Sequence, residues 1–192
     1  NLFITPAELR YNLYDYSYTS GNSKSAKAHW NEYAQFLKNN GLLENKILEI
    51  GSNDGYLLKK LTSNKTFVLG IDASSTMANA TRRQGLNVLN DTFGSKNKIA
   101  ENIYSSYGKF DLIIANNVLN HSNDFLDFIY AVFFLLEKNG KFIFEVPYWL
   151  NTIKDKTFDQ IYHEHLTYFT AKSIDKIAKL LNFKIVHMSY ID

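Results

Sequence analysis

The sequence predicts an α/β domain with a mostly parallel sheet and helices on both of its faces. After residue 45, short apolar segments alternate with longer amphipathic ones, which is the order that crossover connections between parallel strands require. The chain has 192 residues, of which 45% are hydrophobic, so it can bury one substantial core. We therefore expect a single domain of this class.

The expected elements follow from these apolar segments and from the turns between them. Strands are predicted at residues 46–50, 67–72, 87–89, 110–116, 141–147 and 184–189. Helices are predicted at residues 25–39, 56–62, 76–84, 99–106, 124–138 and 171–181. Gly41, Gly85 and Gly140 each follow an expected helix, where a left-handed residue can satisfy the last carbonyl groups.

The first 23 residues differ in character from the rest of the chain. Four tyrosines alternate there with small polar residues, at Tyr11, Tyr14, Tyr16 and Tyr18. We interpret residues 1–23 as a tyrosine-rich flap and residues 24–192 as the folded domain.

Composition narrows the function classes. The net charge is +2, with 21 basic and 19 acidic residues mixed along the chain, so a nucleic acid partner is not expected. No cysteine is present, which excludes disulfides, thiolate zinc sites and a cysteine nucleophile. The longest apolar run, residues 128–136, is far shorter than the roughly 20 residues that span a bilayer. We expect a cytoplasmic protein without a membrane segment, and the first residue, Asn1, suggests a segment of a longer chain.

The sharpest motif is a strand that breaks into a glycine-bounded turn at residues 51–55. Gly51 permits the tight turn, and Gly55 lets the backbone approach a ligand beside the free amides of the next helix. Asp72 ends the following strand, 21 residues after Gly51, where a carboxylate binds a pair of ribose hydroxyls. The alternative is an ordinary strand-to-helix turn followed by an acidic loop residue.

The spacing Glu-x-Gly-x-x-x-Gly, which starts at Glu49, lacks the glycine that leaves room for a pyrophosphate. It resembles the first motif of S-adenosylmethionine methyltransferases. The resemblance implies that the turn holds the amino-acid end of this cofactor and that Asp72 binds its ribose. The candidate cofactor residues of these two strand ends are Glu49, Gly51, Ser52, Asn53, Gly55, Asp72 and Ala73.

The next two expected strand ends add further candidates at the same edge. Asp91, Thr92 and Phe93 follow the third strand, where such enzymes contact the adenine through a carboxylate and an apolar face. The alternative is a simple turn, which Asn90 and Asp91 favour in any case. Asn116 ends the fourth strand, and its expected role is a backbone contact to the methionine end of the cofactor.

Three of the five histidines fall in loops near this edge: His121 after the fourth strand, and His163 and His165 after the fifth. Histidine titrates near neutral pH and therefore suits proton removal from a substrate. A zinc site of these three histidines and a plain surface loop are the alternatives. In an extended Tyr162–His165 segment the side chains alternate, whereas in a helical turn Tyr162 and His165 share a face.

Taken together, these motifs resemble the sugar C-methyltransferases that act on dTDP-linked 4-keto deoxysugars. The segments concerned are Glu-Ile-Gly-Ser-Asn-Asp-Gly, Gly-Ile-Asp, Asn-His, Glu-Val-Pro-Tyr and the string of residues 158–169. The resemblance implies a Rossmann-like class I methyltransferase fold, with S-adenosylmethionine as cofactor and a nucleotide sugar as substrate. It implies that His165 removes a proton next to the ketone and that the enolate attacks the activated methyl group, a transfer that needs no metal. The implied catalytic residues are His165, Glu164, Tyr162 and His121, with Tyr16 or Tyr18 from the flap.

The chain departs from that family in two respects. Family members usually carry an amino-terminal zinc domain and a carboxyl-terminal domain, and their fold inserts an antiparallel seventh strand for which this sequence offers no segment. The alternatives are oxygen methylation of a small metabolite or glycan, and a cofactor-binding module without catalysis. Amine methylation is less expected, because residues 116–119 lack the Asn/Asp-Pro-Pro-aromatic turn. The oligomeric state stays open.

Overall fold

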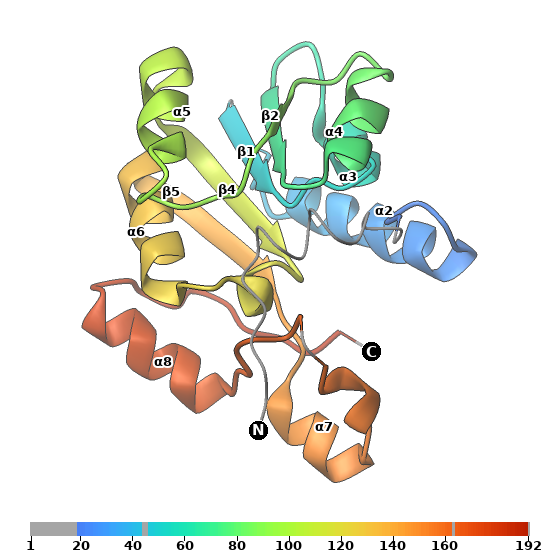
Figure 1. The fold of residues 1–192 in the computed structure, drawn as a ribbon, viewed down its shortest axis with the longest axis vertical. Helices are drawn as coiled ribbons and strands as arrows, with labels where there is room; N and C mark the ends of the chain where they lie inside the picture. The colour runs from blue at the N-terminus through green and yellow to red at the C-terminus, as the bar shows by residue number, and fades with distance from the viewer. Residues whose placement is uncertain (1–18, 44–45, 163, 192) are drawn as a thin grey trace.

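The computed structural model describes residues 19–43, 46–162 and 164–191. The tyrosines of the predicted flap, Tyr11, Tyr14, Tyr16 and Tyr18, lie outside the described residues, as does His163. Within the described part, a twisted sheet forms the centre of the domain and helices cover both of its faces (Figure 1). The predicted α/β class with a parallel sheet is confirmed.

Across residues 19–43, 46–162 and 164–191 the sheet has five strands, all parallel, in the order β3-β2-β1-β4-β5. The chain builds outward from β1 to one edge and then from β4 to the other. Ligands of such sheets bind outside the carboxyl ends of the strands, where the order reverses, here between β1 and β4. The strands are β1 (Lys46–Ile50), β2 (Phe67–Asp72), β3 (Val88–Asn90), β4 (Phe110–Asn116) and β5 (Leu136–Glu145).

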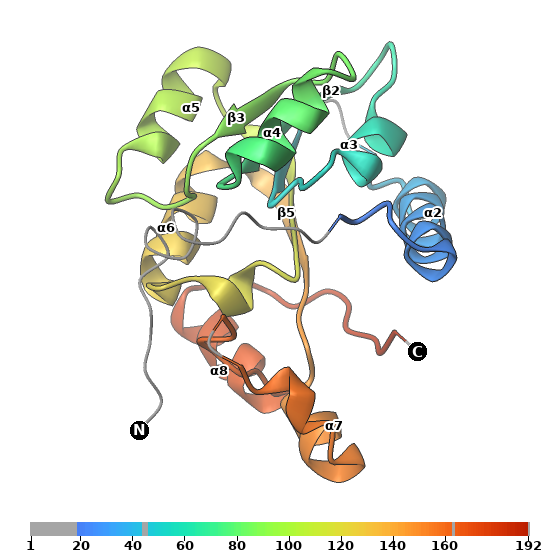
Figure 2. The ribbon, with the colours of Figure 1, turned by 45° about the vertical axis from the view of Figure 1, so that its right-hand side comes forward.

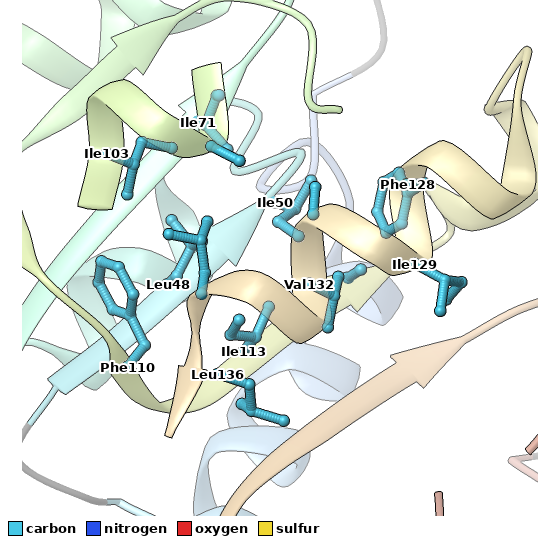
Figure 3. Close-up of a cluster of buried hydrophobic side chains, with 14 of the residues drawn as sticks. Leu48, Ile50, Ile71, Ile103, Phe110, Ile113, Phe128, Ile129, Val132 and Leu136 are labelled. Atoms are coloured by element: carbon cyan, nitrogen blue, oxygen red, sulfur yellow. The ribbon is translucent and has the colours of Figure 1, made fainter. Parts of the chain in front are cut away.

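Two apolar clusters hold the helices against the sheet. In β1, Leu48 and Ile50 face the cluster beneath α5 and α6, whereas Ile47 faces the cluster beneath α2 and α3. Figure 3 shows the first cluster, in which Phe110 and Val132 are completely buried. The helices are α2 (Lys24–Asn39), α3 (Tyr56–Leu61), α4 (Ser75–Arg82), α5 (Ile99–Tyr107), α6 (Phe125–Leu135), α7 (Trp149–Asp155) and α8 (Ala171–Leu180).

Polar side chains fix where four of these helices begin. Ser23, Ser74 and Asp124 each accept a hydrogen bond from an amide in the first turn of α2, α4 and α6. Thr170 and Ser173 form a reciprocal capping box at the start of α8. Such caps satisfy amides that have no partner within the helix, which sets the helix start from local sequence.

The boundary between α6 and β5 differs from the prediction. The helix ends at Leu135 and β5 starts at Leu136, so the expected helix end at 138 and strand start at 141 were wrong. Leu136 pairs with Phe110 across an irregularity in the ladder, which extends the strand toward its amino end. Gly140 therefore lies inside β5 and does not end a helix, whereas Gly41 and Gly85 have the expected positive φ of 63° and 76°.

The carboxyl-terminal part also differs. Residues 184–189 form no strand, and Val186 and Met188 are exposed. An alternating pattern becomes a strand only where a neighbouring strand satisfies its backbone, and no described strand pairs with this segment. Helix α7 was not predicted, because it is short and of its residues only Thr152 is buried. In Figure 2, α7 and α8 lie beyond the end of β5.

None of the helices in the described ranges is long and apolar enough to cross a bilayer.

Candidate functional site

The turn after β1 is held in place by β2 and by the loop after β4. The amides of Gly51 and Ser52 both donate to the carbonyl of Ile71, at 2.7 and 3.2 Å. Gly51 has a φ of 71°, and a Cβ atom there would lie 2.2 Å from Cγ2 of Val118. Only glycine therefore allows the turn to lie this close to the residue that precedes the His121 loop.

Gly55 has a different reason for lacking a side chain. It is the N-cap of α3, with a φ of 79°, and a Cβ atom would meet the side chain of Thr81 at 2.8 Å. The hydroxyl of Thr81 also donates to the carbonyl of Asn53 at 2.8 Å. Packing of α4 against the turn accounts for this glycine, and its role toward a cofactor stays a prediction.

The Asp72 carboxylate points toward the turn. One oxygen accepts a hydrogen bond from the amide of Asn53 and the other from the amide of Ser74, each at 2.8 Å. Burial raises the pKa of Asp72, and the two amide hydrogen bonds oppose that rise. Asp72 thus joins the end of β2 to the turn after β1. A ligand that lies across the ends of both strands would meet this carboxylate.

Two buried polar atoms beside the turn have no hydrogen-bond partner among the described residues: Oε2 of Glu49 and Oγ of Ser52. Burial raises the pKa of Glu49 well above its usual value, and the nearby charges of Asp72 and Asp54 add to the effect. Buried polar groups are normally paired, so this unpartnered carboxyl group fits a ligand that brings a positive charge, which would lower the pKa of Glu49 and favour its charged form. The ammonium end of S-adenosylmethionine satisfies this requirement.

The candidates after β3 lie next to Asp72. The amide of Asp91 donates to the carbonyl of Asp72 at 3.1 Å, and the side-chain amide of Asn90 donates to the carbonyls of Asp72 and Ala73. Asp91 is exposed, and its carboxylate accepts from the amide of Thr92. The Phe93 ring packs with its edge against a ring of the core, and this contact holds it at the carboxyl end of the sheet. Its contact partner is Phe128, with ring centroids 5.0 Å apart.

The loops after β4 and β5 are hydrogen-bonded to each other. The carbonyl of Asn120 accepts from the amides of Leu166 and Thr167, at 2.8 and 3.2 Å. This places the His121 and His165 rings in contact, with centroids 4.9 Å apart. The structure therefore brings together two candidate residues, His121 and His165, that lie more than 40 residues apart in sequence.

Tyr162 and His165 lie as the turned alternative predicts. The amide of His165 donates to the carbonyl of Tyr162 at 3.0 Å, and the two rings lie 4.2 Å apart between centroids. Tyr162 and His165 therefore share a face. Glu164 is partly buried beside them, while Tyr16 and Tyr18 are not among the described residues.

One ring nitrogen of His165 is bound to the backbone. Its Nδ1 lies 2.8 Å from the carbonyl of Gln160, which can only accept, so Nδ1 carries the proton and Nε2 keeps its lone pair. Burial lowers the pKa of His165, and this outweighs the opposing effects of Gln160 and Glu164. The ring is therefore neutral near pH 7. In residues 19–43, 46–162 and 164–191, no three metal-ligating side chains gather as a metal site.

Sequence reasoning did not select three residues at the same edge: His29 and Tyr33 on α2, and Glu145 at the end of β5. Nε2 of His29 lies 3.0 Å from a carboxylate oxygen of Glu145, and the Tyr33 hydroxyl donates to Oδ1 of Asn116 at 3.2 Å. Glu145 lay inside the predicted strand 141–147, and only the structure places it at the end of β5, as Asp72 is at the end of β2. The contacts from α2 had no local signal.

Comparison with known proteins agrees with this geometry. The methyltransferase domain family matches residues 24–188. The chain belongs to this family. It is 27% identical over 146 residues to the C-methyltransferase NovU of Streptomyces niveus, a match that covers 76% of the chain and 34% of that relative. The chain thus spans about a third of the length of this curated relative.

Solved methyltransferases share the fold. An S-adenosylmethionine-dependent methyltransferase from Archaeoglobus fulgidus superposes with a TM-score of 0.65 at 16% identity, covering 84% of this chain and 69% of that one. The magnesium protoporphyrin IX methyltransferase of Synechocystis, solved with bound S-adenosylhomocysteine, gives 0.58 at 17% identity, with 80% and 71% covered. The predicted methyltransferase family and the predicted Rossmann-like class I fold are confirmed.

Replacing Gly51 by alanine tests the contact with Val118. We expect Gly51→Ala to lose about 1–2 kcal/mol through backbone strain and about 1–3 kcal/mol more through the clash. Gly85→Ala is the matched control, because Gly85 also has a positive φ but a Cβ atom there would meet nothing within 4 Å. Urea unfolding measures both variants, and equal losses would show that Val118 does not constrain the turn.

Replacing Asp72 by asparagine tests the cofactor site. The side-chain amide would face a backbone amide and offer one acceptor fewer to a ribose, so we expect cofactor affinity to fall about 10- to 100-fold. Calorimetry with S-adenosylmethionine measures this. Asp111→Asn is the control, since Asp111 also accepts a backbone amide, from Lys46, but at the opposite edge of the sheet. Unchanged affinity in Asp72→Asn would remove Asp72 from the site.

Proposed function

We propose that the chain transfers a methyl group to a carbon next to the ketone of a nucleotide-linked 4-keto deoxysugar, with His165 as the base. The observation that carries this proposal is the 2.8 Å contact between Nδ1 of His165 and the carbonyl of Gln160, which leaves the lone pair on Nε2, in a loop hydrogen-bonded to the residues that follow β4. The likeness to a C-methyltransferase supports carbon as the methylated atom. Methylation of an oxygen has no comparable support.

The turn after β1 and the end of β2 hold the methyl donor. When bound, S-adenosylmethionine supplies an electrophilic methyl group on a sulfonium centre. Asp72 faces the turn and accepts hydrogen bonds, so it binds the ribose hydroxyls, and the unpartnered oxygen of Glu49 accepts from the ammonium group. Asn116, at the end of β4, lies between this region and the loop of His121.

His165 removes the proton from the carbon beside the ketone. That carbon would then bond to the methyl group as the methyl–sulfur bond of the bound donor breaks, with the electron pair of that bond staying on the sulfur. A ketone makes this proton acidic because the charge moves onto its oxygen, and hydrogen bonds to that oxygen supply much of the catalysis. Tyr162 is a candidate donor of one such bond, because its ring contacts that of His165. Burial and the charge of Glu164 raise its pKa, so the phenol stays protonated. The ring of His121, in contact with His165, is the second candidate donor.

We expect His165→Asn to reduce turnover by at least about 100-fold, the usual contribution of a general base, while cofactor affinity stays within a factor of two. Mass spectrometry of the sugar after incubation with a dTDP-linked 4-keto sugar measures turnover, and calorimetry measures affinity. His187→Asn serves as the control, because His187 is exposed and its ring contacts the ring of Phe36. Full activity of His165→Asn would remove His165 from the mechanism.

The pH profile tests the environment of His165. Since burial lowers its pKa, the base stays unprotonated through neutral pH, and kcat/KM should fall only below the usual value of 6.5. The charge of Glu164 raises the pKa of His165, so Glu164→Gln should move the acid limb of the profile to still lower pH. An acid limb that moves upward would contradict the assignment of His165 as the titrating base.

A further inference from the structure

Helix α2 makes two polar contacts with adjacent strand ends. The Tyr33 hydroxyl donates to Oδ1 of Asn116, and the His29 ring contacts one carboxylate oxygen of Glu145, which lies 116 residues away in sequence. Asn116 and Glu145 are direct partners in the ladder between β4 and β5. The rings of His29 and Tyr33 also pack against Trp30, so the two contacts come from a fixed surface.

Each of the two strand-end side chains keeps one polar atom without a partner among the described residues. These atoms are Oε1 of Glu145, an acceptor, and Nδ2 of Asn116, a donor. Side chains at partnered positions of adjacent strands point to the same face, with the strands roughly 4.8 Å apart. A buried donor and acceptor side by side match a ligand whose own acceptor and donor are neighbours.

The place of this pair in the sheet indicates which ligand it serves. Apart from the backbone of Asn116, the candidate cofactor residues gather at the ends of β1, β2 and β3, on one side of the reversal in strand order. Glu145 belongs to β5, on the other side, and the chain continues from it to the His165 loop. The two unpartnered atoms therefore lie on the side of the sheet where the proposed sugar substrate binds. Burial raises the pKa of Glu145, and the contact with His29 opposes this rise.

We propose that the side chains of Asn116 and Glu145 bind the oxygens on two neighbouring ring carbons of the sugar acceptor, with His29 and Tyr33 as positioning residues. The amide of Asn116 donates to one oxygen, and the carboxylate of Glu145 accepts from a hydroxyl. This inference rests on the proposed function and adds to it the group that recognises the hydroxyl pattern of the sugar. Sites that pair a substrate hydroxyl discriminate strongly against analogues that lack it.

The test compares a dTDP-linked 4-keto sugar with analogues that each lack one ring hydroxyl. We expect the unaltered chain to use one analogue about 10- to 100-fold less well in kcat/KM. In Glu145→Gln the KM for the parent sugar should rise by a similar factor, and the discrimination against that analogue should disappear. The kcat and the affinity for S-adenosylmethionine should change by less than threefold. His29→Gln should raise the KM in the same direction by a smaller factor.

The control is Asp175→Asn, which removes the same charge from an exposed ion pair with Lys179 and should leave KM and discrimination unchanged. If Glu145→Gln does not fold, Glu145→Asp replaces it in the test. Its shorter side chain keeps the charge but moves it away from the sugar, so this variant should also lose discrimination. Retained discrimination in the Glu145 variants, or an equal loss of cofactor affinity, would overturn this inference alone. If the unaltered chain methylates none of the dTDP-linked keto sugars, the proposed acceptor and this inference fall together.

Discussion

The hydrogen bonds that Asp72 accepts from the amides of Asn53 and Ser74 are the constraint on which the cofactor side of the site depends. They tie the end of β2 to the turn after β1, and Thr81 fixes the same turn from α4. A carboxylate so oriented cannot rotate away without leaving buried amides unpaired, which is costly. The backbone therefore fixes the position of the Asp72 carboxylate before any cofactor binds.

A second link joins the cofactor turn to the reacting groups. Gly51 packs against Val118, and the next residues form the short helix Leu119–His121. The Asn120 carbonyl then holds the loop of His165 through two amides. A path of direct contacts thus runs from the turn to the loop of His165, the proposed base. Because methyl transfer requires donor and acceptor atoms in line and close together, this rigidity between the two loops matters as much as the identity of the side chains.

Local patterns in the sequence predicted most of the sheet. The bounds of β1, β2 and β4 agree with the prediction, because each is an apolar run with a clear turn at its end. The start of β5 was wrong, since Leu136 is set by pairing with Phe110 and not by Gly140. Asp72 was selected as a candidate from its spacing after Gly51. The contact of His29 with Glu145 did not, because it depends on how α2 lies across the sheet, which no local pattern encodes.

A crystal structure of the chain with S-adenosylhomocysteine tests the central claim most directly. The account predicts both ribose hydroxyls within hydrogen-bond distance of the Asp72 carboxylate, the amino-acid end beside Glu49, and the sulfur atom directed toward the loops of His121 and His165. A nucleoside bound elsewhere, or a crevice filled by side chains with Asp72 turned away from the ribose, would contradict it.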